Sequence, residues 1–116
     1  MHRITTLTKR PDFLRAARAA RAPGPAFLVQ ARRRSEGEGV PGELIRVGFT
    51  CSKKVGNAVA RNRAKRRLRA IARDILPLEG RPGWDYVLIG RANETAARPY
   101  AEMKADLSRA LRKLHT

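Results

Sequence analysis

Apolar residues recur along this chain with two different spacings, and each spacing predicts one kind of secondary structure. In residues 44–51 apolar side chains occupy every second position, which is typical of a strand with one face in a core. Residues 26–31 show the same alternation, with Phe27 and Val29 on one face. Residues 84–90 form a strongly apolar run of strand length, which we expect near the centre of a sheet. The pattern therefore predicts three strands.

Three other segments place apolar residues at the spacing of amphipathic helices. The first covers about residues 11–21, with Pro11 in its first turn, where proline is well tolerated. The second covers about residues 58–76 and follows Asn57, a residue type that caps helices well. The third begins at Pro99 and runs toward the end of the chain, and it should cover the sheet.

Prolines and glycines separate these elements. Residues 23–25 and 77–83 are expected to end the first two helices, because proline cannot continue the helical hydrogen-bond pattern. Residues 33–43 are rich in glycine and charge, and they predict a mobile hairpin loop between the first two strands. With no repeat and no linker, residues 1–116 predict one α+β domain, an α/β sandwich with the order α-β-β-α-β-α.

Composition narrows the possible partners. The chain has 26 lysines and arginines against 10 acidic residues, a formal charge of +16. Such a surplus is tolerable when a polyanion neutralises it, and arginine suits phosphate and base recognition better than a membrane surface. One cysteine and two histidines near the termini give no disulfide and no zinc site. The start of the chain has no apolar run of signal-peptide length, so we expect a cytoplasmic protein.

The positive charge is concentrated on one predicted helix. No acidic residue lies between Glu43 and Asp74. Wound as a helix, residues 58–76 place an apolar stripe on one side and a basic arc opposite it. A charged run usually marks a solvated helix face, but like charges without acidic partners repel each other, which favours selection for phosphate contact. The cations of this region are Arg46, Lys53, Lys54, Arg61, Arg63, Lys65, Arg66, Arg67, Arg69 and Arg73, and the stripe is Ala64, Leu68, Ile71 and Ile75.

Residues 46–69 read RVGFTCSKKVGNAVARNRAKRRLR, and this string resembles the signature region of the bacterial ribonuclease P protein family. The Arg-Asn-Arg-x-Lys-Arg-x-x-Arg core from Arg61 to Arg69 is highly specific, and a weaker likeness covers nearly the whole chain. The resemblance implies an unusual left-handed crossover through the basic helix. It also implies a role in an endonuclease holoenzyme whose catalytic RNA, with Mg²⁺ bound mainly by RNA and substrate, removes the 5′ leader of precursor tRNA. No protein residue is then expected to be catalytic.

The same resemblance assigns two sets of binding residues. The leader is expected in a cleft lined by Phe13, Ala17 and Gln30. The family commonly has aromatic residues at the last two positions, so leader contacts here should rely less on stacking. Phe13 is equally explained as a core residue, and Cys51, Trp84 and Tyr86 are assigned to packing. The RNA-binding residues are expected to be Lys53, Lys54, Arg61, Asn62, Arg63, Lys65, Arg66, Arg69 and Arg73.

Three other functions remain as alternatives. A ribosomal-type RNA-binding protein would share the charge and size, but it gives no reason for an Arg-Asn-Arg motif after a glycine turn. A cationic membrane-active protein would need an exposed apolar face. An independent nuclease would need a carboxylate pair or a histidine beside the basic helix. The resemblance implies two RNA partners, the catalytic RNA and precursor tRNA, and we expect no membrane and no obligate protein partner.

Overall fold

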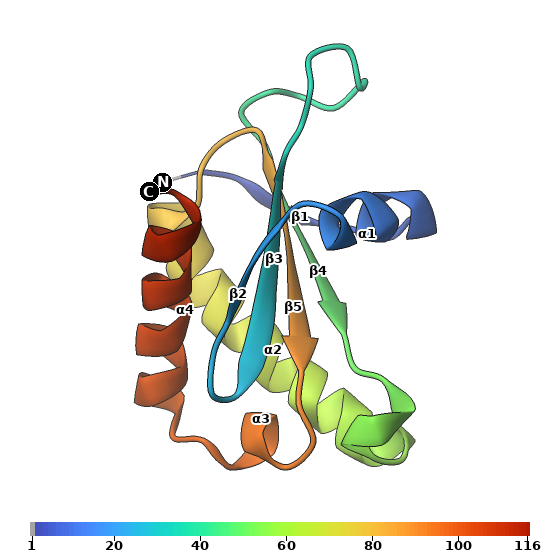
Figure 1. Ribbon diagram of the computed structural model, residues 1–116, viewed down its shortest axis with the longest axis vertical. Coiled ribbons are helices and arrows are strands. Elements are labelled where there is room, and N and C mark those ends of the chain that lie inside the picture. The colour runs from blue at the N-terminus through green and yellow to red at the C-terminus, as the bar shows by residue number, and fades with distance from the viewer. Residues whose placement is uncertain (1) are drawn as a thin grey trace.

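The computed structural model describes residues 2–116, which form one mixed sheet covered by helices (Figure 1). The five strands have the spatial order β1-β4-β5-β3-β2. Strands β1, β4 and β5 run parallel, and β3 and β2 are antiparallel to their neighbours. The strands are β1 (Ile4–Thr6), β2 (Ala20–Pro23), β3 (Phe27–Arg33), β4 (Ile45–Thr50) and β5 (Trp84–Gly90). The most apolar predicted strand is β5, and its expected central place is confirmed.

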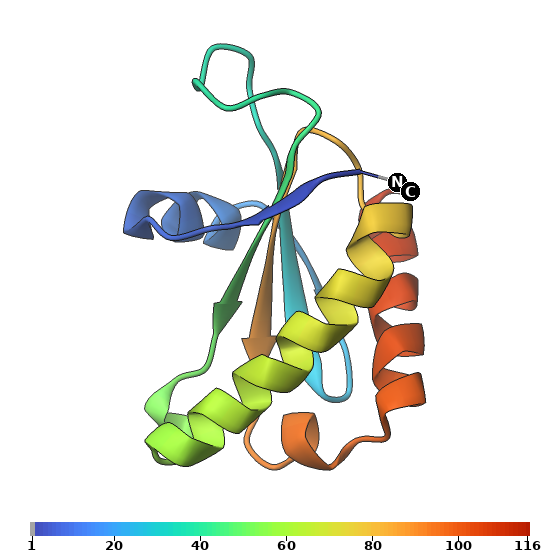
Figure 2. The ribbon, with the colours of Figure 1, turned by 180° about the vertical axis from the view of Figure 1, so that it is seen from behind.

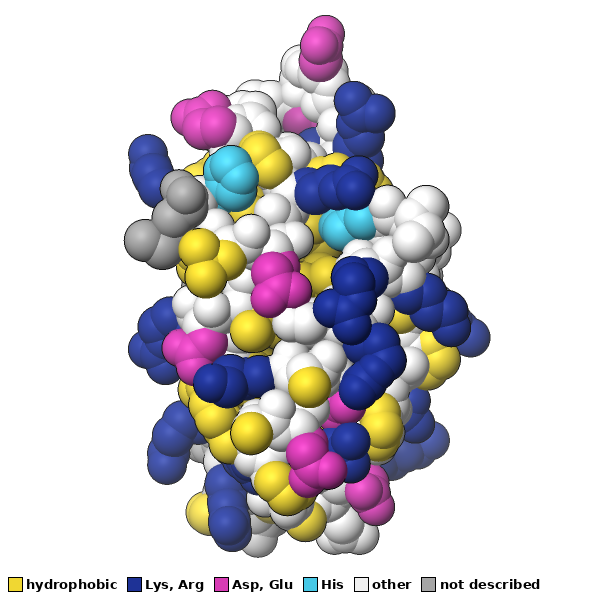
Figure 3. Space-filling view, turned by 90° about the vertical axis from the view of Figure 1, so that its left-hand side faces the viewer, with side chains coloured by type: hydrophobic (Ala, Val, Ile, Leu, Met, Phe, Trp, Pro, Cys, Tyr) yellow, Lys and Arg dark blue, Asp and Glu magenta, His cyan; other side chains and the backbone are white. Residues whose placement is uncertain are grey.

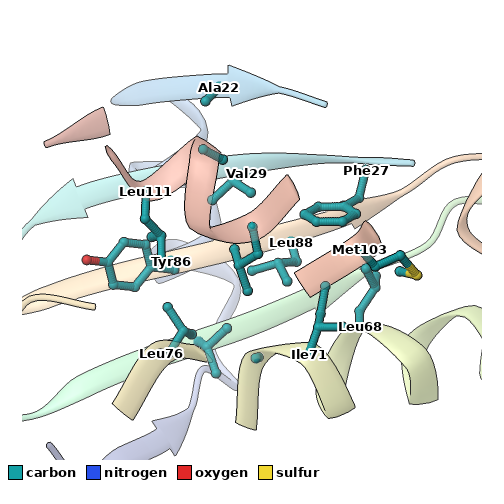
Figure 4. Close-up of a cluster of buried hydrophobic side chains, with 14 of the residues drawn as sticks. Ala22, Phe27, Val29, Leu68, Ile71, Leu76, Tyr86, Leu88, Met103 and Leu111 are labelled. Atoms are coloured by element: carbon teal, nitrogen blue, oxygen red, sulfur yellow. The ribbon is translucent and has the colours of Figure 1, made fainter. Parts of the chain in front are cut away.

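One face of the sheet is covered by the two long helices, α2 (Ala58–Glu79) and α4 (Tyr100–Leu114), which pack against each other. Figure 2 shows α2 running diagonally across this face beside α4. Both helices bury an apolar stripe against the strands (Figure 4). Leu68, Ile71 and Leu76 of α2 and Met103, Leu107 and Leu111 of α4 are at most 2% exposed. This layer is the main core of the protein.

The opposite face carries the short helix α1 (Arg10–Ala17) over a smaller cluster that contains Leu7, Ala16 and Val87. The Phe13 ring lies directly on Gly48 of β4, where a Cβ atom would stand only 2.4 Å from the ring. A side chain at this position would force the ring to move, so glycine lets α1 pack closely on β4. The apolar face of β4 is buried as predicted, with Ile45 at 0% and Val47 at 3% exposed. The opposite face is covered by α1 at Gly48, which the pattern of residues 44–51 did not predict, while Thr50 stays exposed.

The first predicted helix is too long. It ends at Ala17, where Arg18 and Ala19 tighten the last turn by donating to carbonyls three residues back. Residues 20–23 are strand β2 instead, and Ala22 pairs with Val29 and is 1% exposed. Pairing with β3 overrides the helix preference of alanine here.

Two further predictions need correction. Helix α2 does not stop before Pro77 but continues to Glu79. The proline ring removes only one backbone hydrogen bond near the end of the helix, and Gly80 N–H still donates to Leu76 O at 2.9 Å. The predicted hairpin loop, residues 33–43, does not join neighbouring strands, because β5 lies between β3 and β4 and the connecting segment must pass its end. The predicted element order also lacked β1, β2 and the short helix α3 (Glu94–Ala97).

The connection β4-α2-β5 is a crossover between adjacent parallel strands, as the resemblance implies. Its left-handed sense stays a prediction. Among residues 2–116, no helix combines the length and apolar character that crossing a membrane requires.

Candidate nucleic-acid interface

A short capped turn fixes where α2 begins. Residues Lys53–Val55 form a single 3₁₀ turn, in which the Ser52 side chain accepts a hydrogen bond from Lys54 N–H at 3.3 Å. Gly56 follows with φ 143°, a conformation that disfavours any side chain. The Asn57 side chain then accepts from Ala60 N–H at 2.9 Å, so the predicted N-cap is confirmed. Lys53 and Lys54 are exposed just before the helix.

The inner side of α2 anchors it to the sheet. Ala64, Leu68 and Ile71 are at most 1% exposed, whereas Ile75 is only partly buried. Ala72 and Leu76 complete the buried stripe, which is wider than the predicted one. Burial of this stripe fixes the rotation of the helix, so the polar side must face outward.

The outward side carries the predicted RNA-binding residues, which we call the basic ridge. Within residues 2–116, no carboxylate lies within 4.0 Å of any charged group of the ridge. Arg61 and Lys65 are partly exposed and the other members are exposed. The ridge consists of Lys53, Lys54, Arg61, Asn62, Arg63, Lys65, Arg66, Arg69 and Arg73. Eight cations are thus held toward solvent without neutralising partners, which is the electrostatic arrangement of a phosphate-binding surface.

Two arginines of the same segment have structural roles instead. The Arg67 guanidinium donates to the carbonyl oxygens of Ala96 and Arg98 at 2.5 and 2.6 Å, which ties α2 to α3. Arg46 on β4 donates to both carboxylate oxygens of Asp85 at 2.8 and 2.7 Å. Hydrogen bonding to Asp85 raises the pKa of Arg46. Arg46 was part of the predicted charge concentration, but its partner lies 39 residues away in sequence and only the fold brings them together.

An aromatic ring beside the ridge was missed by sequence reasoning. The Arg69 guanidinium carbon lies 5.6 Å from the centroid of the Phe49 ring. Both residues line a hollow of about 220 Å³ between α2 and the edge of the sheet, together with Arg73. The alternation of β4 could have indicated that Phe49 faces α2. It could not indicate an open groove, because strand β1 was not predicted.

The three predicted cleft residues lie on or under α1, but they do not line one open hollow. Phe13 is partly buried in the cluster under α1, Ala17 is exposed, and Gln30 is 8% exposed. A hollow of about 420 Å³ does open beside α1, and Asp12, Arg15, Glu38 and Arg46 are among the residues that line it. Its lining is mostly polar, and it contains none of the three predicted cleft residues.

The face that carries α4 has a different charge pattern. Figure 3 shows acidic and basic side chains mixed over this face. Asp106 accepts hydrogen bonds from Arg98 and Arg109, the closest at 2.5 Å. Mixed and paired charges of this kind are typical of an ordinary solvated surface. The ridge on α2 is therefore a local feature and not a consequence of the overall composition.

Within residues 2–116, no three His, Cys, Asp or Glu side chains lie close enough to hold a metal ion. Cys51 is 9% exposed, and burial raises the pKa of its thiol. Tyr86 is 0% exposed and stacks with Trp84 at a centroid distance of 6.4 Å, so both contribute to packing as predicted.

The fold and the ridge define a small α+β nucleic-acid-binding domain, and comparison with known proteins defines the family. The family model for ribonuclease P matches residues 1–115, and the chain belongs to the ribonuclease P protein family. It is 66% identical to the ribonuclease P protein component of Ruegeria pomeroyi over 112 residues, which covers 97% of this chain and 87% of that protein. The Caulobacter vibrioides protein is 49% identical over 105 residues, covering 90% of this chain and 67% of its own length.

Solved structures share the fold. The RNase P protein of Staphylococcus aureus superposes with a TM-score of 0.68 at 23% identity, covering 93% of both chains. That of Thermotoga maritima gives 0.65 at 24% identity, covering 90% of this chain and 89% of the other. The family membership makes this chain a component of the tRNA-processing ribonuclease P system, and the predicted fold class is confirmed.

Proposed function

We propose that the chain binds the catalytic RNA of ribonuclease P and the 5′ leader of precursor tRNA, and thereby assists leader removal by the RNA. The observation that carries this proposal is the basic ridge, whose cations have no carboxylate within 4.0 Å in residues 2–116. Phosphate groups of RNA would supply the missing counter-charge. Arginine can hold a phosphate with two parallel hydrogen bonds, which also fixes the orientation of the strand.

The ridge and the face of α1 are suited to different parts of the RNA. The ridge is almost purely cationic, so it fits the backbone of a folded RNA, which we take to be the catalytic RNA. The hollow beside α1 is lined by Lys9 and by Arg15 and Arg46, which pair with Asp12, together with other polar side chains. We assign the single-stranded leader to this side, next to Phe13, Ala17 and Gln30. Polar contacts would dominate there, because Phe13 is the only aromatic member of that set.

Chemistry is assigned to the RNA. Hydrolysis of the phosphodiester would use Mg²⁺ bound mainly by the catalytic RNA and the substrate, so no protein residue takes part in bond breaking. The protein lowers the repulsion between two RNA molecules and so strengthens substrate and metal binding at moderate salt. We place this reaction in the cytoplasm.

The test is cleavage of precursor tRNA by the catalytic RNA at low Mg²⁺ concentration, with and without the protein. We expect strong stimulation by the wild-type chain and weak stimulation by a variant in which Arg63 and Arg66 are replaced by glutamine. Replacement of Arg109 and Arg112, exposed cations of α4, is the matched control and should have little effect. Absence of stimulation by the wild-type chain would contradict the proposal and favour a ribosomal-type RNA-binding role.

A further inference from the structure

A second hollow, of about 400 Å³, lies between the first turns of α2 and the segment that joins β5 to α4. Its lining is largely apolar. Val55, Ala60 and Ala64 contribute from the α2 side, and Ala96 contributes from α3. Three of these four side chains are single methyl groups, and they leave a space that longer side chains would fill.

The wall formed by the α3 segment is held in place by buried hydrogen bonds. Thr95 is 0% exposed, and its hydroxyl accepts from Arg91 N–H at 2.8 Å and donates to Ala26 O at 2.6 Å. Arg67 binds two carbonyl groups of the same segment. Asn93 keeps φ at 65°, an unfavourable value for a residue with a side chain. The hollow is therefore preformed, with a strained polar residue in its lining.

The rim carries positive charge and one unexplained apolar side chain. Arg63 and Arg91 both line the hollow, both are exposed, and neither has a carboxylate within 4.0 Å in the described part of the chain. Val59 also lines it and is 76% exposed, more than any other large apolar side chain in residues 2–116. Packing of the fold gives no reason for valine at this position.

We propose that this hollow binds one unstacked nucleobase of an RNA partner, with the adjoining phosphates on Arg63 and Arg91. The inference deepens the proposed RNA-binding function and rests on it. Arg63 belongs both to the basic ridge and to the hollow, so a strand that follows the ridge reaches the hollow without a break. Apolar groups and arginine planes contact the faces of a base, and the Asn93 amide can both donate to and accept from its edge.

The first test follows the backbone amide resonances of the full chain during titration with adenosine 3′,5′-bisphosphate. Inorganic pyrophosphate is the control, because it carries phosphate charge without a base. We expect the base-bearing probe to shift residues 57–64 and 93–96 together, and pyrophosphate to shift Arg91 and the ridge residues with little change in residues 93–96. Equal effects of the two probes on residues 93–96 would overturn the inference.

The second test fills the hollow. Ala60→Leu should weaken binding of adenosine 3′,5′-bisphosphate about tenfold, the loss of one base stack, and leave pyrophosphate binding unchanged. Ala70→Leu makes the same change on α2 outside the hollow and should behave as the wild type. Asn93→Gly, which relieves the positive φ, should keep the fold and also weaken the base-bearing probe.

The outcomes separate this inference from the function on which it rests. If folded Ala60→Leu bound adenosine 3′,5′-bisphosphate as tightly as the wild type, the nucleobase site would be refuted. Should Ala60→Leu not fold, wild-type affinity in Asn93→Gly would refute it. In both cases, ridge shifts with pyrophosphate would still support RNA binding. If neither probe shifted the ridge in the wild-type chain, the proposed function itself would be contradicted.

Discussion

Arginines lie on both sides of the sheet, but the two groups are held in opposite ways. On the α1 side, Arg34 and Arg46 surround Asp85, whose carboxylate is 0% exposed. Arg34 also donates to the carbonyls of Trp84, Pro41 and Leu44, and only 3% of its side chain is exposed. On the other side, the arginines of the basic ridge face solvent and contact no carboxylate in residues 2–116.

The difference separates arginines that stabilise the fold from the unpaired arginines that we propose bind RNA. A guanidinium that is buried with a carboxylate is neutralised, and removal of one partner leaves an uncompensated charge. An exposed guanidinium without a partner adds repulsion to the folded state and gains its counter-charge from a ligand. Substitutions in the two groups should therefore affect different measurements.

The largest loss of stability should come from Asp85→Asn. The change keeps the size of the side chain but removes the charge that faces Arg34 and Arg46. We expect the free energy of unfolding to fall by roughly 3–5 kcal/mol, measured by urea denaturation. A loss below about 1 kcal/mol would mean that this cluster is not structural.

A neighbouring pair on α2 gives the sharpest contrast. Arg67→Ala removes the donors to Ala96 O and Arg98 O, and it should cost about 1–3 kcal/mol because two carbonyls lose charged partners. Arg66→Ala should change stability by less than about 0.5 kcal/mol but clearly weaken RNA binding. Thermal melting together with RNA titration checks both variants. If Arg66→Ala destabilised the protein as much as Arg67→Ala, the division between them would be wrong.

Low pH should weaken the ion pair between Arg32 and Glu38 on the α1 side of the sheet. Arg32 donates to both oxygens of Glu38 and Ser35 N–H donates to one of them, and these bonds lower the pKa of Glu38 from 4.5 to about 2. Because the folded-state pKa is depressed, this contribution is complete above the unfolded pKa and is lost as pH falls from about 4.5 to 2. Unfolding measured against pH should show a shallower acid loss for Glu38→Gln than for the wild type. Identical profiles would contradict this role of Glu38.

The sequence was most informative where local pattern and long-range structure agree. The apolar run of β5, the cap at Asn57 and the amphipathic stripe of α2 were predicted correctly because each depends on neighbouring residues. The strand Ala20–Pro23 and the partners of Arg46 were not, because each depends on contacts with distant segments. The same holds for the Phe49 groove and the hollow beside α3, which exist only once β1 and α3 are in place. The exposure of the ridge was predictable, since it follows from burial of the opposite stripe.

The most direct test of the central claim is the salt dependence of RNA affinity for the wild-type chain and for the Arg63→Gln, Arg66→Gln variant. If the ridge binds RNA phosphates, the wild-type affinity should fall steeply with salt. The fall of log affinity with log salt concentration should be steeper for the wild type than for the variant, by about 0.7 for each single-strand phosphate that the variant no longer neutralises. Equal slopes for the two proteins would show that the RNA does not bind on the ridge.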